Sequence, residues 1–178
     1  LNRNVKLYLI GFGLVAFAYF GIMGVLFNLY LVRLGFGAEF IGLLIGSGQL
    51  VWAIMALPAG AIGMRIGLSR ALALSQLLVA VGFSLVLIVE WLPRPLWEGW
   101  LIVAWMILWI GAALLTVNGT PFVMAATREE ERKHAFSLQQ AIMALLTFSG
   151  SLVAGWLPGV LARWLGTTLD HPAPYRLT

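Results

Sequence analysis

The chain has 178 residues, of which 61% are hydrophobic and only 10% are charged. A soluble domain carries about 25% charged residues, so this composition indicates a protein that is solvated by lipid. The net charge of +4 is spread over loops, without the clusters of basic and aromatic residues that nucleic-acid binding would need. The absence of cysteine excludes disulfides and thiolate chemistry.

Five long stretches of the sequence lack Asp, Glu, Lys and Arg. Each is close to or above the roughly 20 residues that a helix needs to cross a bilayer. Barrel strands would show polar alternation, which these stretches do not have. The sequence therefore predicts an all-α, multi-pass transmembrane helix bundle with spans at about 6–32, 39–64, 68–90, 97–127 and 133–165.

The charges between these stretches predict the orientation of the chain. If the spans alternate in direction, seven Lys and Arg residues fall on one side of the membrane and four on the other. Because Lys and Arg accumulate in short cytoplasmic loops, we expect the N-terminus in the cytoplasm and the spans in a cell (inner or plasma) membrane. The larger group consists of Arg3, Lys6, Arg65, Arg70, Arg128, Arg132 and Lys133.

The residues between the second and third spans predict a hairpin that closes at a water interface. Gly60, Gly63 and Gly67 should permit a tight reversal of the chain. Arg65 and Arg70 should hold this hairpin on the cytoplasmic side.

This hairpin resembles the cytoplasmic loop between helices two and three of the major facilitator superfamily. The pattern of that family reads roughly Gly-x-Leu-Ala-Asp-Arg-x-Gly-Arg-Arg. Met64 stands where the family has its aspartate, and Leu68 where it has the first arginine after the last glycine. The matching places are taken by Gly60, Ile62, Gly63, Arg65 and Gly67. The resemblance implies that this loop forms part of a cytoplasmic gate, with Gly60, Gly63, Arg65, Gly67 and Arg70 as its residues.

Two later segments carry the same resemblance. Glu131 and Arg132 match the end of the acidic and basic loop that joins helices four and five in many members. The glycine-rich segment 150–159 resembles the fifth helix of the family. Thr127 and Glu130 have the spacing of a capping box, which would begin the fifth helix in water.

The resemblance implies both a fold and a function. Six helices form one half of a major facilitator carrier, so residues 1–178 are expected to be most of the amino-terminal half, cut at the mouth of a sixth span. Such a carrier moves a small molecule by alternating access, and the partners implied are the lipid bilayer, the substrate and the second half. The alternative is a non-transporting integral membrane subunit that packs in a larger complex.

Polar residues within the spans are the candidates for a substrate path. In hydrocarbon such groups need partners, so they should face other helices or water. The resemblance implies that helices one, two, four and five line a central cavity, while hydrogen bonding between helices remains an equal alternative for each residue. The candidates are Asn28, Gln49, Thr116, Asn118, Gln139, Gln140, Thr147 and Ser151.

Small residues repeat along one face of the second span and predict a close contact with another helix. Small side chains let backbones approach, which replaces the hydrophobic driving force that lipid does not supply. Gly46 is therefore expected to tolerate added bulk less well than Leu44 tolerates truncation. The face consists of Gly42, Gly46, Gln49, Ala53, Ala56 and Gly60.

No residue pattern points to an enzyme, a metal site or another cofactor. His134 and His171 are far apart in the sequence, without partners at metal-ligand spacing, and no nucleophile–base pair or phosphate loop is visible. The five spans contain no ionisable group near the membrane centre, because Glu39, Glu90 and Glu98 fall at their outer ends. This half is therefore expected to carry no proton relay across the membrane.

Overall fold

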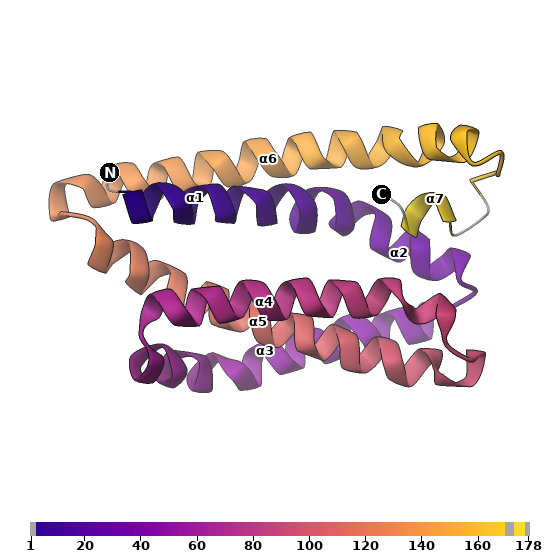
Figure 1. The fold of residues 1–178 in the computed structure, drawn as a ribbon, viewed down its shortest axis with the longest axis horizontal. Helices are drawn as coiled ribbons and strands as arrows, with labels where there is room; N and C mark the ends of the chain where they lie inside the picture. The colour runs from indigo at the N-terminus through magenta and orange to yellow at the C-terminus, as the bar shows by residue number, and fades with distance from the viewer. Residues whose placement is uncertain (1–2, 170–172, 177–178) are drawn as a thin grey trace. The chain divides into compact units, whose positions relative to one another are not determined.

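The computed structural model describes residues 3–169 and 173–176, and these residues are almost entirely helical (Figure 1). The described residues contain no strand, and the predicted fold class, an all-α multi-pass bundle, is confirmed. Five helical segments are long and apolar enough to cross a membrane: Arg3–Arg33, Ala38–Ile66, Leu68–Leu87, Arg94–Ala126 and Glu129–Trp164.

The chain divides into two compact units, which we describe separately. Unit 1 comprises residues 1–37 and 126–178 and contains the first and fifth spans. Unit 2 comprises residues 38–125 and contains the second, third and fourth spans.

Unit 1 is built on two long helical segments and one short helix. The first span is an unbroken helical segment with an eight-residue π-helix in its middle, where i→i+5 bonding replaces the α pattern. The elements of this unit are α1 (Arg3–Val15), the π-helix η1 (Ala16–Met23), α2 (Gly24–Arg33), α6 (Glu129–Trp164) and α7 (Ala173–Arg176).

The two long segments of unit 1 run side by side and parallel (Figure 1). Gln139 Nε2 donates to the Tyr8 hydroxyl at 3.3 Å, and Thr147 Oγ1 donates to the Ala16 carbonyl at 3.5 Å. Both pairs are separated by 131 residues, so residue numbers rise together along the two segments. Parallel packing is what the first and fifth of five alternating spans require.

The backbones of these two segments touch at a pair of glycines. A Cβ atom added at Gly21 would lie 2.7 Å from the Cα atom of Gly150. One added at Gly150 would overlap the carbonyl oxygen of Phe17 and lie 2.9 Å from Gly21 Cα. Because the neighbours are backbone atoms, no side-chain rotation can make room, and only glycine fits at either position.

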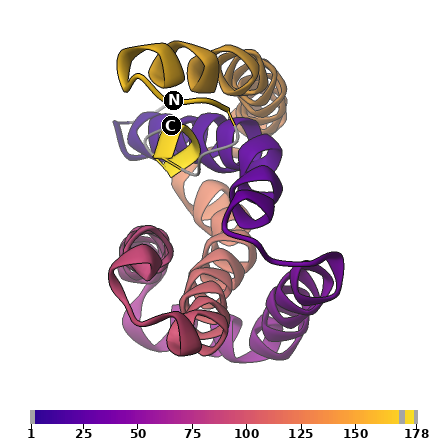
Figure 2. The same cartoon turned by 90° about the vertical axis from the view of Figure 1, so that its right-hand side faces the viewer.

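Unit 2 contains three long helices, of which α5 lies between the other two (Figure 2). Two short 3-10 turns connect α4 to α5. The elements are α3 (Ala38–Ile66), α4 (Leu68–Leu87), η2 (Val89–Trp91), η3 (Arg94–Leu96) and α5 (Trp97–Ala126).

Helices α4 and α5 also approach each other through glycines. A Cβ atom at Gly82 would lie 2.8 Å from Leu108 Cα, and one at Gly111 would lie 2.8 Å from the carbonyl oxygen of Ser75. Residue numbers fall along α4 as they rise along α5, so these helices are antiparallel, as consecutive spans must be.

Helix α3 packs on the other side of α5 through two further glycines. An added Cβ atom at Gly48 would overlap the indole of Trp109 and lie 2.5 Å from Trp105 Nε1. One at Gly63 would overlap the side-chain oxygen of Asn118. The contacts advance along both helices together, so α3 and α5 run parallel, in keeping with their being the second and fourth spans.

The reversal between α3 and α4 is shorter than the predicted hairpin. Gly60 and Gly63 lie inside α3, which continues to Ile66, and Gly67 is the one residue between the helices. Gly67 has a φ of +89°. Its N–H donates to the Gly63 carbonyl at 3.0 Å, and its own carbonyl accepts from the Ala71 N–H at 3.0 Å. One residue in the left-handed region therefore makes the turn, and the other glycines serve helix packing instead.

The start of α6 is one residue later than the predicted capping box. The N-cap is Arg128, in an extended conformation with φ −71° and ψ 156°. Its N–H donates to the Glu131 carboxylate at 3.4 Å. The predicted pair of Thr127 and Glu130 is wrong by one residue, because Glu131 is the carboxylate that stands three residues after the N-cap.

The small-residue face predicted on α3 is offset from the face that packs in unit 2. Cβ atoms added at Gly42 and Gly46 would meet no atom within 4 Å. Leu44 is fully buried instead, and Gly48 receives the Trp109 indole. Within unit 2 the close contact predicted at Gly42 and Gly46 is therefore not formed, because α5 packs against Leu44 and Gly48 instead, and the comparison of bulk at Gly46 with truncation of Leu44 stays a prediction.

We predict that Gly150→Ala lowers the free energy of unfolding by about 1–3 kcal/mol, since the new methyl group would force two backbones apart. Gly155→Ala on the same helix is the matched control, because a Cβ atom there meets nothing within 4 Å. Unfolding of both variants in detergent should be followed by circular dichroism. Equal stability of the two variants would contradict the contact between Gly21 and Gly150.

Candidate functional site

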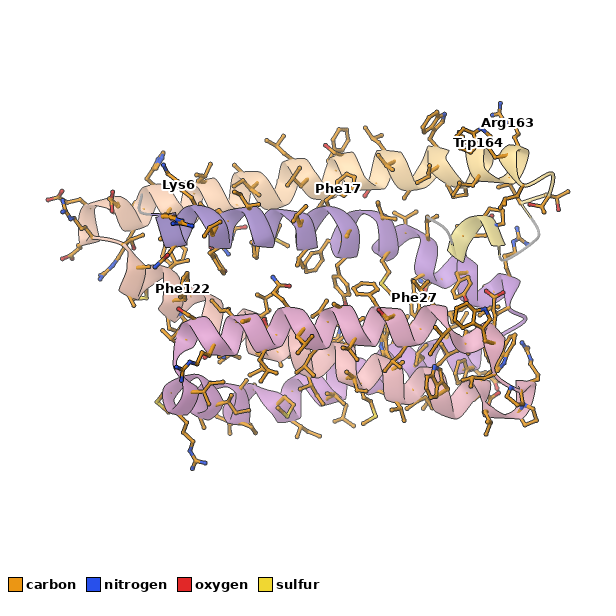
Figure 3. All side chains as sticks on the ribbon, viewed as in Figure 1. Lys6, Phe17, Phe27, Phe122, Arg163 and Trp164 are labelled. Atoms are coloured by element: carbon orange, nitrogen blue, oxygen red, sulfur yellow. The ribbon has the colours of Figure 1, made fainter. Side chains whose placement is uncertain are left out.

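Charged and aromatic residues mark the two ends of each unit. Lys6 lies at one end of unit 1, and Arg163 and Trp164 lie at the other (Figure 3). Trp164 is 85% exposed, as expected of a side chain at the membrane interface. In unit 2 the Arg94 guanidinium lies 4.1 Å from the ring centroid of Trp97, at the end opposite to the α3–α4 turn.

Three of the five candidates in unit 1 are engaged in hydrogen bonds near the contact between the first and fifth spans. Gln139 is bound to Tyr8, and Thr147 is bound to the carbonyl of Ala16. Ser151 donates to the Thr147 carbonyl at 3.0 Å, within its own helix. The bonds of Gln139 and Thr147 fit the alternative of hydrogen bonding between helices, although all three candidate side chains are only half-buried.

The other two candidates of unit 1 are exposed. Asn28 lies in α2 and Gln140 lies in α6, and both side chains have exposed surface in the structure. Gln140 is next to Gln139 in sequence but projects from a different side of the helix. The exposure of these two amides is consistent with the prediction that they face water or a substrate.

Asn118 in unit 2 is a packing residue. Its side chain is 2% exposed. The amide nitrogen donates at 3.0 Å to the carbonyl of Ala59 on α3 and at 3.0 Å to the carbonyl of Leu114 in its own helix. Gly63 leaves the space that the side-chain oxygen occupies. Asn118 thus joins α3 to α5, and its burial favours the structural alternative over a place in a substrate path.

The remaining candidates of unit 2 lie on an exposed side of α3 and α5. Trp52 Nε1 donates to Thr116 Oγ1 at 3.1 Å, and that hydroxyl donates to the carbonyl of Ala112 at 3.0 Å. Gln49 is exposed one turn before Trp52, and Thr120 is exposed one turn after Thr116. An indole, two hydroxyls and an amide thus occur on helices that are otherwise apolar.

The two loop segments predicted from the family resemblance lie at helix ends. Arg65 and Arg70 are exposed on either side of the Gly67 turn. Met64, which takes the place of the family aspartate, is 83% exposed. The remaining pair, Glu131 and Arg132, belongs to the first turn of α6.

The chemistry available in the spans is that of uncharged polar groups. Among the residues that the structure describes, no group of three or more His, Cys, Asp or Glu side chains could hold a metal ion. His171 lies outside the described residues, and His134 is exposed in α6. The polar side chains that remain can donate and accept hydrogen bonds or stack, but they offer no charge to a ligand.

Sequence analysis did not single out Trp52, Tyr8 or Gly48, and it assigned Gly63 to the hairpin rather than to the contact with Asn118. For Trp52 a signal was present: it falls in the middle of its apolar stretch, whereas tryptophan prefers the membrane–water interface. Tyr8 and the two glycines act through partners more than 50 residues away, so their roles depend on which helices pack together.

Five alternating apolar helices with uncharged polar side chains are the arrangement of a multi-pass membrane protein. The model of the Major Facilitator Superfamily matches residues 8–167. The match covers most of the chain, and the chain belongs to this superfamily.

The chain is also similar to curated relatives called multidrug resistance protein MdtH, from Yersinia enterocolitica (serotype O:8 / biotype 1B), Yersinia pestis (strain Pestoides F) and Yersinia pseudotuberculosis (serotype O:1b). Identity to each is 28% over 151 residues, which is 81% of this chain and 34% of the relative. The chain thus spans about a third of the length of these relatives. No solved structure gives a significant match.

The contact of Gly63 with Asn118 gives a prediction for stability. Gly63→Ala should lower the free energy of unfolding by about 1–3 kcal/mol, because the methyl group would displace the hydrogen-bonded amide. Gly60→Ala is the control, since its nearest neighbour is Val117 Cγ1 at 3.7 Å. Adding Asn118→Ala to Gly63→Ala should cost less than the sum of the two single changes, as expected for residues in contact. Strict additivity in this double-mutant cycle would show that the two residues do not touch.

Proposed function

We propose that the chain forms part of a membrane carrier that moves a small organic molecule across the bilayer by alternating access. Membership of the Major Facilitator Superfamily over residues 8–167 is the observation that carries this proposal. In this proposal the chain supplies part of the amino-terminal half, and the second half of the carrier supplies the opposite wall of the substrate path.

Exposed amides on apolar helices support a path rather than a purely structural role. Asn28, Gln49 and Gln140 each place an exposed amide on a membrane span. An amide among lipid tails has no hydrogen-bond partner, which is costly in hydrocarbon. A water-filled path between two halves gives these side chains the partners that lipid denies them.

The proposed substrate is an uncharged or amphipathic organic compound. The relatives from Yersinia are named multidrug resistance proteins, which favours drug-like compounds. The candidate side chains are amides, hydroxyls and an indole, and none of them can neutralise a charge on the substrate. Burial of apolar surface and hydrogen bonds are therefore the main contributions that these side chains can make to substrate binding.

Gln49→Leu provides the test of the path. We predict that this change lowers efflux of a fluorescent amphipathic dye by about 2- to 10-fold at equal membrane abundance, since it removes one hydrogen-bonding side chain from the path. Gln76→Leu on α4 is the matched control and should leave efflux unchanged. Unchanged efflux in Gln49→Leu, together with increased stability, would show that Gln49 faces lipid. No efflux of any dye by the natural protein would contradict the carrier itself.

We also propose that the N-terminus and the α3–α4 turn face the cytoplasm. The excess of Lys and Arg at that end supports this orientation. Because the chain has no cysteine, single cysteines at Ser69 and Arg94 can be labelled with a membrane-impermeant maleimide. In intact cells Arg94→Cys should react and Ser69→Cys should react only after the membrane is opened. The reverse result would invert the orientation, and labelling of both from one side would exclude the α3–α4 hairpin.

A further inference from the structure

Trp52 occupies a depth at which tryptophan is uncommon in membrane helices. It is the central residue of the 29-residue helix α3, so it lies about 20 Å from either end at a rise of roughly 1.5 Å per residue. Tryptophan prefers the membrane–water interface. Trp91 and Trp164 follow that preference, whereas Trp52 is 37% exposed in the middle of its span.

The hydrogen bonding of Trp52 is complete within unit 2. The indole has one donor and no acceptor, and that donor is bound to Thr116 Oγ1 at 3.1 Å. The hydroxyl in turn donates to the carbonyl of Ala112 at 3.0 Å. The indole therefore needs no further hydrogen-bond partner, and Thr116 fixes the orientation of the ring. What Trp52 presents is a rigid aromatic surface.

A neighbouring amide indicates that this surface does not face lipid. Gln49 is three residues before Trp52 on α3, so the two side chains are neighbours on the helix surface. Its side chain is exposed. Lipid tails offer no partner to an amide, so the side of α3 that carries Gln49 and Trp52 is suited to water or to a ligand.

Building on the proposed carrier function, we infer that Trp52 is a stacking platform that selects planar aromatic substrates, and that Thr116 is its positioning residue. Aromatic pairs prefer offset-stacked or edge-to-face arrangements, and a planar fused ring can lay its whole face on the indole, whereas a tetrahedral substrate can offer only one of its single rings. No acidic residue occurs within residues 40–64 or 99–127. Selection on this surface therefore depends on the shape of the substrate, and charge adds only the attraction of a cation for the ring.

The test compares two monocations of similar apolar character in the natural protein. Ethidium carries a planar fused phenanthridinium ring, whereas the four single rings of tetraphenylphosphonium point in tetrahedral directions. Trp52→Leu should raise the apparent KM for ethidium by about 2- to 10-fold more than that for tetraphenylphosphonium. Trp52→Phe, which keeps a smaller ring, should shift the ratio of the two KM values in the same direction but less. The ratio is independent of how much protein reaches the membrane.

Trp156→Leu is the matched control, since Trp156 is exposed in α6 and has no assigned role in the path. This variant should leave the KM ratio unchanged. Thr116→Val should lower the ethidium preference because it frees the ring to rotate, and Thr116→Ser should restore it. An unchanged KM ratio in both Trp52 variants would overturn the inference while leaving the carrier intact. If Trp52→Leu does not fold, the ratio measured in Trp52→Phe decides alone. Failure of the natural protein to transport either cation would instead count against the proposed function.

Discussion

Close approach of backbones at glycine is the constraint on which both units depend. In lipid there is no hydrophobic force to drive apolar helices together, so packing must come from contact between atoms that are already surrounded by hydrocarbon. Gly21 and Gly150 meet backbone to backbone, and Gly82 and Gly111 bring α4 against α5 in the same way. At each of these glycines even one added methyl group would come too close to the neighbouring helix. The direction in which each pair of helices runs follows from these contacts and agrees with alternation of five spans.

The same packing sorts the polar side chains by role. Asn118 lies where α5 contacts Gly63 of α3, and its amide nitrogen donates hydrogen bonds to two backbone carbonyls. Thr116 lies away from that contact, and its hydroxyl holds the indole of Trp52 on an exposed side. Gln49 is exposed on the same helix as Trp52. The buried groups hold the bundle together, and the exposed groups are the ones that a substrate could reach, which supports the proposed substrate path.

Sequence alone predicted the number and class of the helices because runs of apolar residues reflect the solvent directly. It also predicted the α3–α4 reversal, but it assigned three glycines to a turn that needs only Gly67. Local composition cannot distinguish a glycine required for a positive φ from one required for contact with a distant helix. The same limit explains the small-residue face. Gly42 and Gly46 have the spacing of a packing face, yet α5 contacts α3 at Gly48 instead, through Trp105 and Trp109. Which glycine packs therefore depends on residues more than 50 positions away in the sequence.

The most direct test of this arrangement is the register of the first and fifth spans. Since residues 1–178 contain no cysteine, pairs can be introduced at positions 8 and 139 and at positions 16 and 147, which hydrogen bonds join in the structure. Both pairs should be joined by a short bifunctional thiosulfonate cross-linker in native membranes, since the hydrogen bond of the first pair spans two long side chains and a direct disulfide needs closer Cα atoms. The exchanged pairs, 8 with 147 and 16 with 139, should not, because eight residues of helix separate them by about 12 Å. Cross-linking of the exchanged pairs, with none in the matched pairs, would contradict parallel packing and the alternating five-span bundle built on it.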